Sequence, residues 1–266
     1  MSTPDKAAAE RAAAAKPKDT LYTDLQALDR GVHRQMRLAR LVHSDHSPAC
    51  GMNSLFANAV EFLDLAREYP VVFVRTGDPA AQNGRLEASP VAVLGLKRGE
   101  NLFLNDDGSW AASYVPATLR SYPFALVHTD DSNYIVCFDK AWSGFSEREG
   151  ERLFDDAGEA TEFMKGVQGF LEQLDAEMQR TRDFCRRLVE LELLQEMRFD
   201  AQMEDGQTLV VDGFLAVNEQ KLAELPDATV VELHRSGILA LLYAHIGSMG
   251  MMRRLVERRL ALKLPV

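Results

Sequence analysis

Cysteine is scarce in this sequence of 266 residues: only Cys50, Cys137 and Cys185 occur, and no two lie close together. Because three is an odd number and no CxxC pair exists, the chain is not a disulfide-stabilised scaffold, and a reducing compartment is the default. The N-terminus lacks the apolar stretch that a secretory signal needs, since Glu10 and Arg11 interrupt its alanine runs. We therefore expect a cytoplasmic protein without a signal peptide.

Long hydrophobic runs are also missing. The longest apolar stretch, residues 237–252, has 16 residues and contains His245. A membrane-spanning helix needs about 20 predominantly apolar residues. The stretch therefore predicts a buried core helix, and we expect a soluble chain with no transmembrane segment.

The sequence contains none of the common catalytic or cofactor motifs. A G-x-S-x-G elbow, a Walker phosphate loop and a dinucleotide-binding G-x-G-x-x-G are all absent. His43 and His46, with His33 upstream, form the one histidine cluster, and Asp45 is a conceivable third ligand. Because zinc needs three or four ligands in a fixed geometry, an exposed polar loop is the better interpretation. We expect neither a metal nor another cofactor.

The charge is acidic and unevenly placed. The chain has 40 Asp and Glu against 30 Lys and Arg, a formal net charge of -10, which disfavours nucleic acid as a partner. Residues 253–266 hold five Arg and Lys and one Glu, a net of +4, which leaves -14 on residues 1–252. This basic end suits the dipole of a final helix, and it also raises the hypothesis of a peripheral membrane contact through residues 253–266.

The region 69–140 is predicted to be rich in strands. Short β-branched and aromatic runs bounded by turn residues are typical of strands, and their short spacing favours antiparallel pairing. Asp107-Gly108 marks a tight turn. The expected strands are residues 71–74, 90–96, 101–104, 122–128 and 134–139.

Most of residues 159–262 is predicted to be helical. Apolar residues recur at helical spacing from Phe163 to Leu191, with Thr161 as the N-cap. Residues 207–218 return to strand character, with Asp212-Gly213 as a turn. Helices are also expected from Asn53 or Ser54 to Glu68, over 218–225, over 227–235, and as one helix over 238–262. The fold class is thus α+β: a small, mainly antiparallel sheet with a helical C-terminal half, preceded by a disordered leader, residues 1–20.

Residues 99–128 gather aromatic side chains around an arginine. Trp110 and Arg120 are the better surface candidates, because aromatics and a planar guanidinium suit recognition surfaces, while Tyr122 and Phe124 are read as core. His245, in the buried C-terminal run, is either a hydrogen-bonded core histidine, which we favour, or a general base.

The same block resembles the SapC-like family. It reads G-x-NLF-x-x-x-DG-x-W-x-x-x-YVP-x-x-x-R-x-YPF, after a helix with Glu61 and before an L-x-x-x-G-x-L-x-L-x-YAH segment. The likeness covers residues 21–255, so we expect one SapC-like domain over 21–266; the leader and residues 41–54 depart from the pattern. The patterned positions are Glu61, Asn101, Trp110, Tyr114, Pro116, Arg120, Tyr122, Pro123, His245 and Ser248.

The resemblance implies a bacterial source and a role beside a paracrystalline surface layer, without established catalytic residues. Our leading hypothesis is a non-catalytic accessory protein that binds a protein or peptide in a surface-layer or cell-envelope process. The binding candidates are Glu61, Asn101, Trp110, Tyr114, Arg120 and His245. The alternative is an enzyme, a hydrolase or a modifier of small molecules or peptides, with His245, Glu61 and Arg120 in one pocket.

Overall fold

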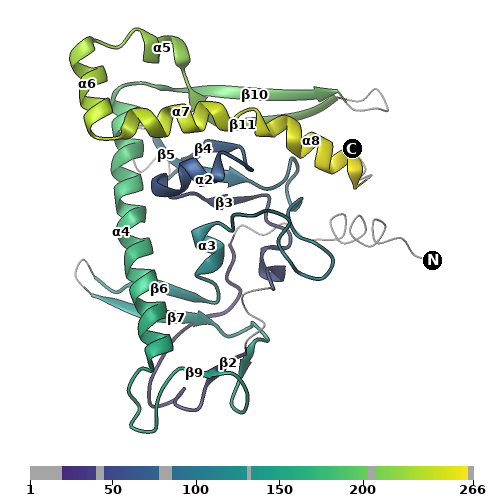
Figure 1. Ribbon diagram of the computed structural model, residues 1–266, viewed down its shortest axis with the longest axis vertical. Coiled ribbons are helices and arrows are strands. Elements are labelled where there is room, and N and C mark those ends of the chain that lie inside the picture. Colours follow the sequence, from purple (N-terminus) through teal and green to yellow (C-terminus); the bar gives the residue numbers. More distant parts are fainter. Residues whose placement is uncertain (1–19, 40–44, 78–85, 131–132, 203–207, 263–266) are drawn as a thin grey trace.

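Three antiparallel sheets and a set of helices make up the fold, as the sequence predicted for an α+β chain (Figure 1). The computed structural model describes residues 20–39, 45–77, 86–130, 133–202 and 208–262. The expected leader, residues 1–20, falls almost wholly outside the described residues. No helix among the described residues is long and apolar enough to cross a membrane.

The largest sheet has five strands in the order β10-β11-β4-β5-β3. β4 lies at its centre, with Val72 opposite Val91 of β5 and Phe73 opposite Leu215 of β11. The strands are β3 (Ser54–Phe56), β4 (Val71–Thr76), β5 (Glu87–Val93), β10 (Leu194–Gln202) and β11 (Thr208–Val217).

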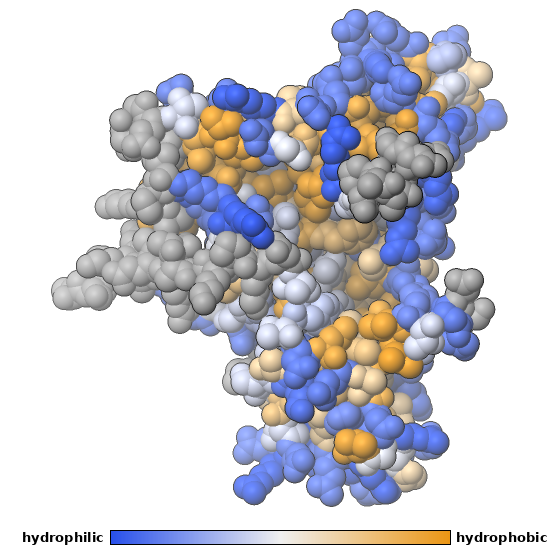
Figure 2. Space-filling model, turned by 180° about the vertical axis from the view of Figure 1, so that it is seen from behind, coloured by the Kyte–Doolittle hydropathy of each residue, from blue (hydrophilic) through white to orange (hydrophobic). Residues whose placement is uncertain are grey.

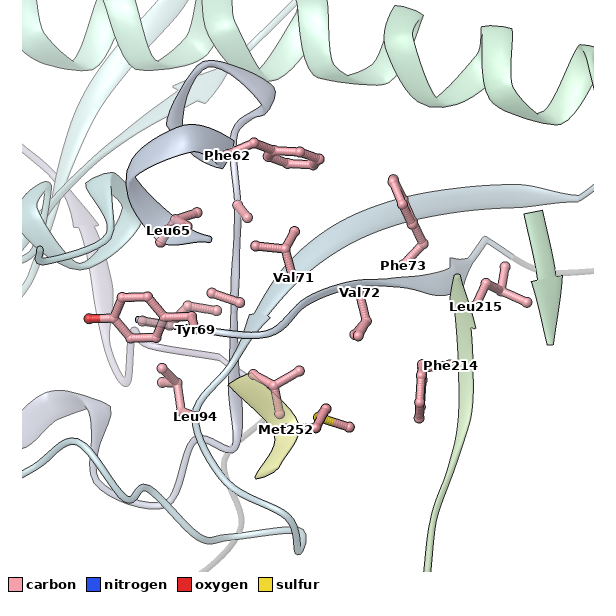
Figure 3. Packing of buried hydrophobic residues seen from close by; sticks show 14 of the residues in the cluster. Phe62, Leu65, Tyr69, Val71, Val72, Phe73, Leu94, Phe214, Leu215 and Met252 are labelled. Atoms are coloured by element: carbon pink, nitrogen blue, oxygen red, sulfur yellow. The ribbon is translucent and has the colours of Figure 1, made fainter. Parts of the chain in front are cut away.

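Val71, Val72 and Phe73 of β4 are buried, and their side chains point to both faces of the sheet. Figure 3 shows Phe62 and Phe73 on one side of β4, and Val72, Phe214 and Met252 on the other. On the first side, Phe184 of the long helix packs against the rings of Phe62 and Phe73. The main core therefore joins strands and helices that lie far apart in the sequence.

Two small sheets form the second part of the molecule. One has the order β1-β7-β6 and the other β8-β2-β9. Phe124 and Phe138 face each other across β6 and β7 and lie in a second hydrophobic cluster. The strands are β1 (Leu25–Ala27), β2 (Arg37–Leu38), β6 (Phe124–His128), β7 (Tyr134–Asp139), β8 (Phe145–Ser146) and β9 (Glu151–Arg152).

The helix α4 (Glu162–Glu190) runs along one side of the molecule and passes both the β6–β7 strands and the five-stranded sheet (Figure 1). Thr161 caps it, as predicted, because its hydroxyl accepts a hydrogen bond from the backbone N–H of Met164 at 3.3 Å. Short helices precede it: η2 (Ser47–Ala49), η3 (Ala59–Glu61), α2 (Phe62–Leu65) and α3 (Ala117–Arg120).

Four helices follow the last strand: α5 (Glu219–Ala223), α6 (Asp227–Arg235), α7 (Ile238–Ser248) and α8 (Met251–Ala261). The single helix predicted over 238–262 is wrong, because the chain breaks it at Met249-Gly250. α8 turns its basic residues partly inward. Arg259 forms a buried ion pair with Glu100, and Arg258 lies 4.4 Å from the centre of the Phe103 ring.

Two sequence predictions about strands are wrong in the C-terminal half. β10 lies within the range that was predicted to be mostly helical. Its alternation of polar and partly buried residues begins directly after the helix α4, and the helical pattern was taken to continue through it. The turn at Asp212-Gly213 is also absent: β11 passes through both residues, and Gly213 adopts a φ of 79° beside a shift in the pairing with β10. A glycine adopts this positive φ without steric strain, as in a β-bulge.

Two predictions also fail before residue 110. The helix from Asn53 or Ser54 is wrong, since Ser54–Phe56 is the strand β3 and the helical turns begin at Ala59 behind the cap Asn58. The strand at 101–104 is reduced to one bridge between Leu104 and Trp110, around the predicted turn.

Figure 2, the view from behind, shows hydrophobic residues gathered over the upper half of the molecule, between hydrophilic stretches.

Candidate functional site

A groove of about 640 Å³ lies between α3, the start of β6 and the N-terminal half of α4. Its walls are mostly apolar, with a few polar groups at its edges, which is typical of binding sites for organic ligands and peptide side chains. The residues used below are Leu119, Arg120, Phe124, Phe163, Val167 and Phe170. Of the predicted site residues, Arg120 lines this groove.

Two hydrogen bonds and two aromatic rings hold the guanidinium of Arg120. Nε donates to the carbonyl of Val115 at 3.1 Å, and Nη2 donates to the hydroxyl of Tyr114 at 3.4 Å. The carbon Cζ lies 5.7 Å from the centre of the Tyr114 ring and 5.4 Å from that of Phe170. Arg120 is exposed, yet these contacts fix its orientation.

Glu61 lies behind Arg120 and is 4% exposed. Its Oε1 accepts hydrogen bonds from the Tyr114 hydroxyl and the Ala117 N–H, both at 2.7 Å. Its Oε2 accepts from the N–H and the side-chain amide of Asn58 at 3.2 and 2.9 Å. Burial, followed by the Glu61 carboxylate, raises the pKa of Tyr114, so its hydroxyl stays protonated and donates to Glu61.

Trp110 is half-buried and belongs to the wall of the main core. Its Nε1 donates to the hydroxyl of Tyr69 at 2.7 Å, and its ring stacks on Phe103 with centroids 5.9 Å apart. The Tyr69 hydroxyl in turn donates to the carbonyl of Tyr114. Trp110 therefore positions the same loop as Glu61.

Asn101 closes a loop and does not reach the groove. It is 7% exposed, its amide nitrogen donates to the carbonyl of Ala49 at 2.9 Å, and its oxygen accepts from the N–H of Phe103 at 3.0 Å. Its amide thus links two loop segments that lie about fifty residues apart in the sequence.

His245 is a buried, hydrogen-bonded histidine on α7, as favoured from the sequence. It is 1% exposed, Nε2 accepts from the N–H of Val217 at 3.0 Å, and Nδ1 lies 2.7 Å from the carbonyl of Val71. Burial lowers the pKa of His245 to about 4. The neutral ring therefore links the first residue of β4 to the last residue of β11.

The structure brings Glu61, Tyr114 and Arg120 into one network and links Trp110 to it through Tyr69. His245 lines a different hollow, of about 260 Å³, with Met197, Phe214 and Met252. Sequence reasoning missed Phe170 and Gly166 on α4, which line the groove beside Arg120. Phe170 belongs to the apolar series that predicted the helix, and Gly166 lies within the same helix, but neither signal marks a groove.

The histidine cluster falls only partly within the described residues. No group of three His, Cys, Asp or Glu side chains in the described ranges could hold an ion. His43 lies outside the described residues. His46 packs against Trp110 with ring centres 5.6 Å apart, and burial lowers its pKa.

The family model SapC matches residues 28–255 of the chain, which is nearly the whole of its length. The chain belongs to the SapC family. Neither the curated proteins nor the solved structures contain a match to it.

Most of the residues that carry the SapC likeness have a structural task in this chain. Glu61 and Tyr114 hold the loop before α3, Ser248 donates to the His245 carbonyl at 2.6 Å, and Tyr122 donates to Asp139 at 3.0 Å. Tyr122 and Arg120 both line the groove, but Arg120 differs from the other residues because its side chain is exposed. Within this SapC-family chain the groove is thus the strongest candidate site.

Proposed function

We propose that this SapC-family chain is a non-catalytic bacterial accessory protein that binds a protein or peptide in a cell-envelope or surface-layer process. The observation that carries the proposal is the groove beside α4. Its apolar walls suit large side chains of a partner, and Arg120 at its edge adds a directed, charged contact.

The arrangement of the predicted site residues favours binding over catalysis. An enzyme built on His245, Glu61 and Arg120 requires the three side chains to meet at one substrate position. His245 and Arg120 line different hollows, and both ring nitrogens of His245 contact backbone groups. The Glu61 carboxylate is buried and accepts four hydrogen bonds from its own fold.

We place this activity in a reducing compartment, with the cytoplasm as the first choice. Cys50, Cys137 and Cys185 are all free thiols. Burial raises the pKa of Cys185 to about 12, which keeps that thiol protonated and unreactive. Fractionation of the source cells, followed by immunoblotting, tests the assignment; recovery of the chain only from the cell surface would overturn it.

Panning of a random peptide display library against the immobilised full-length chain tests the binding function. Enriched peptides are synthesised, and their affinity is measured by fluorescence polarisation with the wild type and with Gly166→Leu. A Cβ at Gly166 meets no atom within 4 Å, so a leucine fits the helix and occupies the groove. We expect binding to weaken at least about tenfold.

Gly169→Leu is the matched control. Gly169 lies three residues further along α4, its Cβ also meets no atom within 4 Å, and it is not among the described residues that line the groove. Both substitutions raise helix propensity by about 0.5–1 kcal/mol, so loss of folding does not distinguish them. Equal binding to both variants, or a library that yields no binder, would refute the proposal.

A further inference from the structure

The guanidinium of Arg120 has one edge already occupied and one edge left for a ligand. Arginine carries five N–H donors in a planar fork. The edge formed by Nε and Nη2 is used by the Val115 carbonyl and the Tyr114 hydroxyl. The other edge, formed by Nη1 and Nη2, retains donors in the geometry that binds a carboxylate through both oxygens. No carboxylate of the described residues forms an ion pair with Arg120.

This edge is held in place before a ligand arrives. The Tyr114 hydroxyl that accepts from Arg120 also donates to buried Glu61, so a chain of hydrogen bonds anchors the guanidinium to the core. The ring of Phe170 on α4 contacts it from the groove side. A pre-oriented arginine loses little side-chain entropy on binding, which favours a specific contact.

The charges around the groove favour a ligand that carries little negative charge. Arg120 is the one permanently charged cation among the described lining residues. Two carboxylates also line the groove: Glu162 accepts from Lys165 at 2.7 Å, and Asp45 accepts from the Ser47 N–H at 3.0 Å. These acids would repel a highly acidic peptide, so one carboxylate beside an apolar group is the best match.

Resting on the proposed function, we propose that the groove recognises a peptide through a single carboxylate next to a large apolar side chain. The carboxylate binds the Nη1–Nη2 edge of Arg120. The apolar side chain enters between Leu119 and the α4 residues Phe163, Val167 and Phe170. The carboxylate belongs either to an Asp or Glu side chain or to the C-terminus of the peptide, and both have the same recognition chemistry.

The test uses wild-type protein and peptides enriched by the library, so it needs no variant that could fail to fold. Each peptide is compared with forms in which Asp is changed to Asn, Glu to Gln, or the C-terminus to an amide. We expect one of these changes, and not the others, to weaken binding by about 10- to 100-fold, because it removes a charge-assisted bidentate contact. The sensitive position identifies the source of the carboxylate.

Arg120→Gln supplies the protein side of the test. It should weaken the carboxylate form to the affinity of the amide form, and it should leave the affinity of the amide form unchanged. If Gly166→Leu blocks binding of the peptides, but their amide forms bind the wild type as well as their carboxylate forms do, this inference is overturned and the proposed function stands. Peptides that bind without any sensitivity to Gly166→Leu would overturn both.

Discussion

At the scale of single residues, Glu61 determines the shape of the candidate site. Each of its carboxylate oxygens accepts two hydrogen bonds, from Asn58 on one side and from Tyr114 and Ala117 on the other. The loop before α3 therefore depends on one buried anion, and α3 itself ends at Arg120. Burial of a carboxylate is costly unless its oxygens are satisfied in this way.

Glu61→Gln should lower the free energy of unfolding, measured in urea, by about 2–4 kcal/mol. The amide nitrogen of the glutamine would face two groups that are themselves hydrogen-bond donors, so both would lose their acceptor. Asp64→Asn, one turn further along, is the control, because its carboxylate is half-exposed and pairs with the exposed Arg67. It should cost less than about 0.5 kcal/mol. If Glu61→Gln proved as mild as the control, the described role of Glu61 would be wrong.

His245 should make the stability of the chain depend on pH. Its pKa is about 4 in the folded chain, while an unfolded histidine titrates near about 6.5. Between these values the unfolded chain binds the proton and the folded chain does not. The stability from the neutral ring is thus complete above pH 6.5 and falls as the pH drops toward 4, at about 1.4 kcal/mol per pH unit.

His245→Gln removes this titration. The difference in unfolding free energy between wild type and variant should therefore shrink by about 2 kcal/mol between pH 7 and pH 5 in urea titrations. His234→Gln is the control, because His234 lies exposed on α6. A constant difference between wild type and His245→Gln across this pH range would contradict the buried, neutral state.

At the scale of elements, the sequence predicted best where local signals and packing agree. β7 and the cap of α4 by Thr161 were predicted correctly, because a β-branched and aromatic run between turn residues and a capping hydroxyl are local features. β10 was missed because its signal is short and follows directly on a long helical pattern: Met197, Phe199 and Ala201 alternate with the exposed Arg198 and Asp200, and pairing with β11 makes this run a strand. An alternation this short is ambiguous in the sequence until the strand that pairs with it is known.

The helix α8 should depend on its buried ion pair. Arg259 is 1% exposed and pairs with Glu100, which also accepts from the Leu96 N–H at 2.8 Å. Arg259→Met leaves a buried carboxylate behind and should cost about 3–5 kcal/mol in urea unfolding. Adding Glu100→Gln to it should recover part of that loss, because no buried charge then remains.

Arg253→Met is the control on the same helix. Arg253 pairs with Glu257, but the two side chains are 86% and 59% exposed, so its loss should cost less than about 1 kcal/mol. Equal costs for the two arginines would show that the pair with Glu100 does not anchor α8.

At the scale of the whole molecule, the candidate site joins parts of the chain that sequence reasoning treated separately. The sequence pointed to Arg120 and to its aromatic neighbours, because they stand close together in one block. It gave no means of placing Phe170 of α4 against the same guanidinium, since fifty residues separate them and only the packing of α4 beside β6 and α3 brings them together.

The distribution of charge over the molecule bears on the hypothesis of a membrane contact through residues 253–266. Arg258 donates to the carbonyl of Ala111 at 3.0 Å, Arg259 pairs with Glu100, and Arg253 pairs with Glu257. Arg258 and Arg259 are thus engaged within the fold, and Glu100 neutralises one unit of the segment's net +4, on a chain whose total charge is -10. Each free basic residue contributes about 1 kcal/mol to binding at an anionic surface.

We accordingly expect the full-length chain to stay unbound in flotation with vesicles of phosphatidylcholine and phosphatidylserine at physiological salt. Removal of residues 253–266 would be an unsuitable test, because it also removes Leu255 and Arg259 from the core. The double variant Arg253→Glu, Arg254→Glu changes only exposed side chains of α8. Wild-type chain that floats, and loses this in the double variant, would establish the membrane contact; flotation that persists would assign it to another surface.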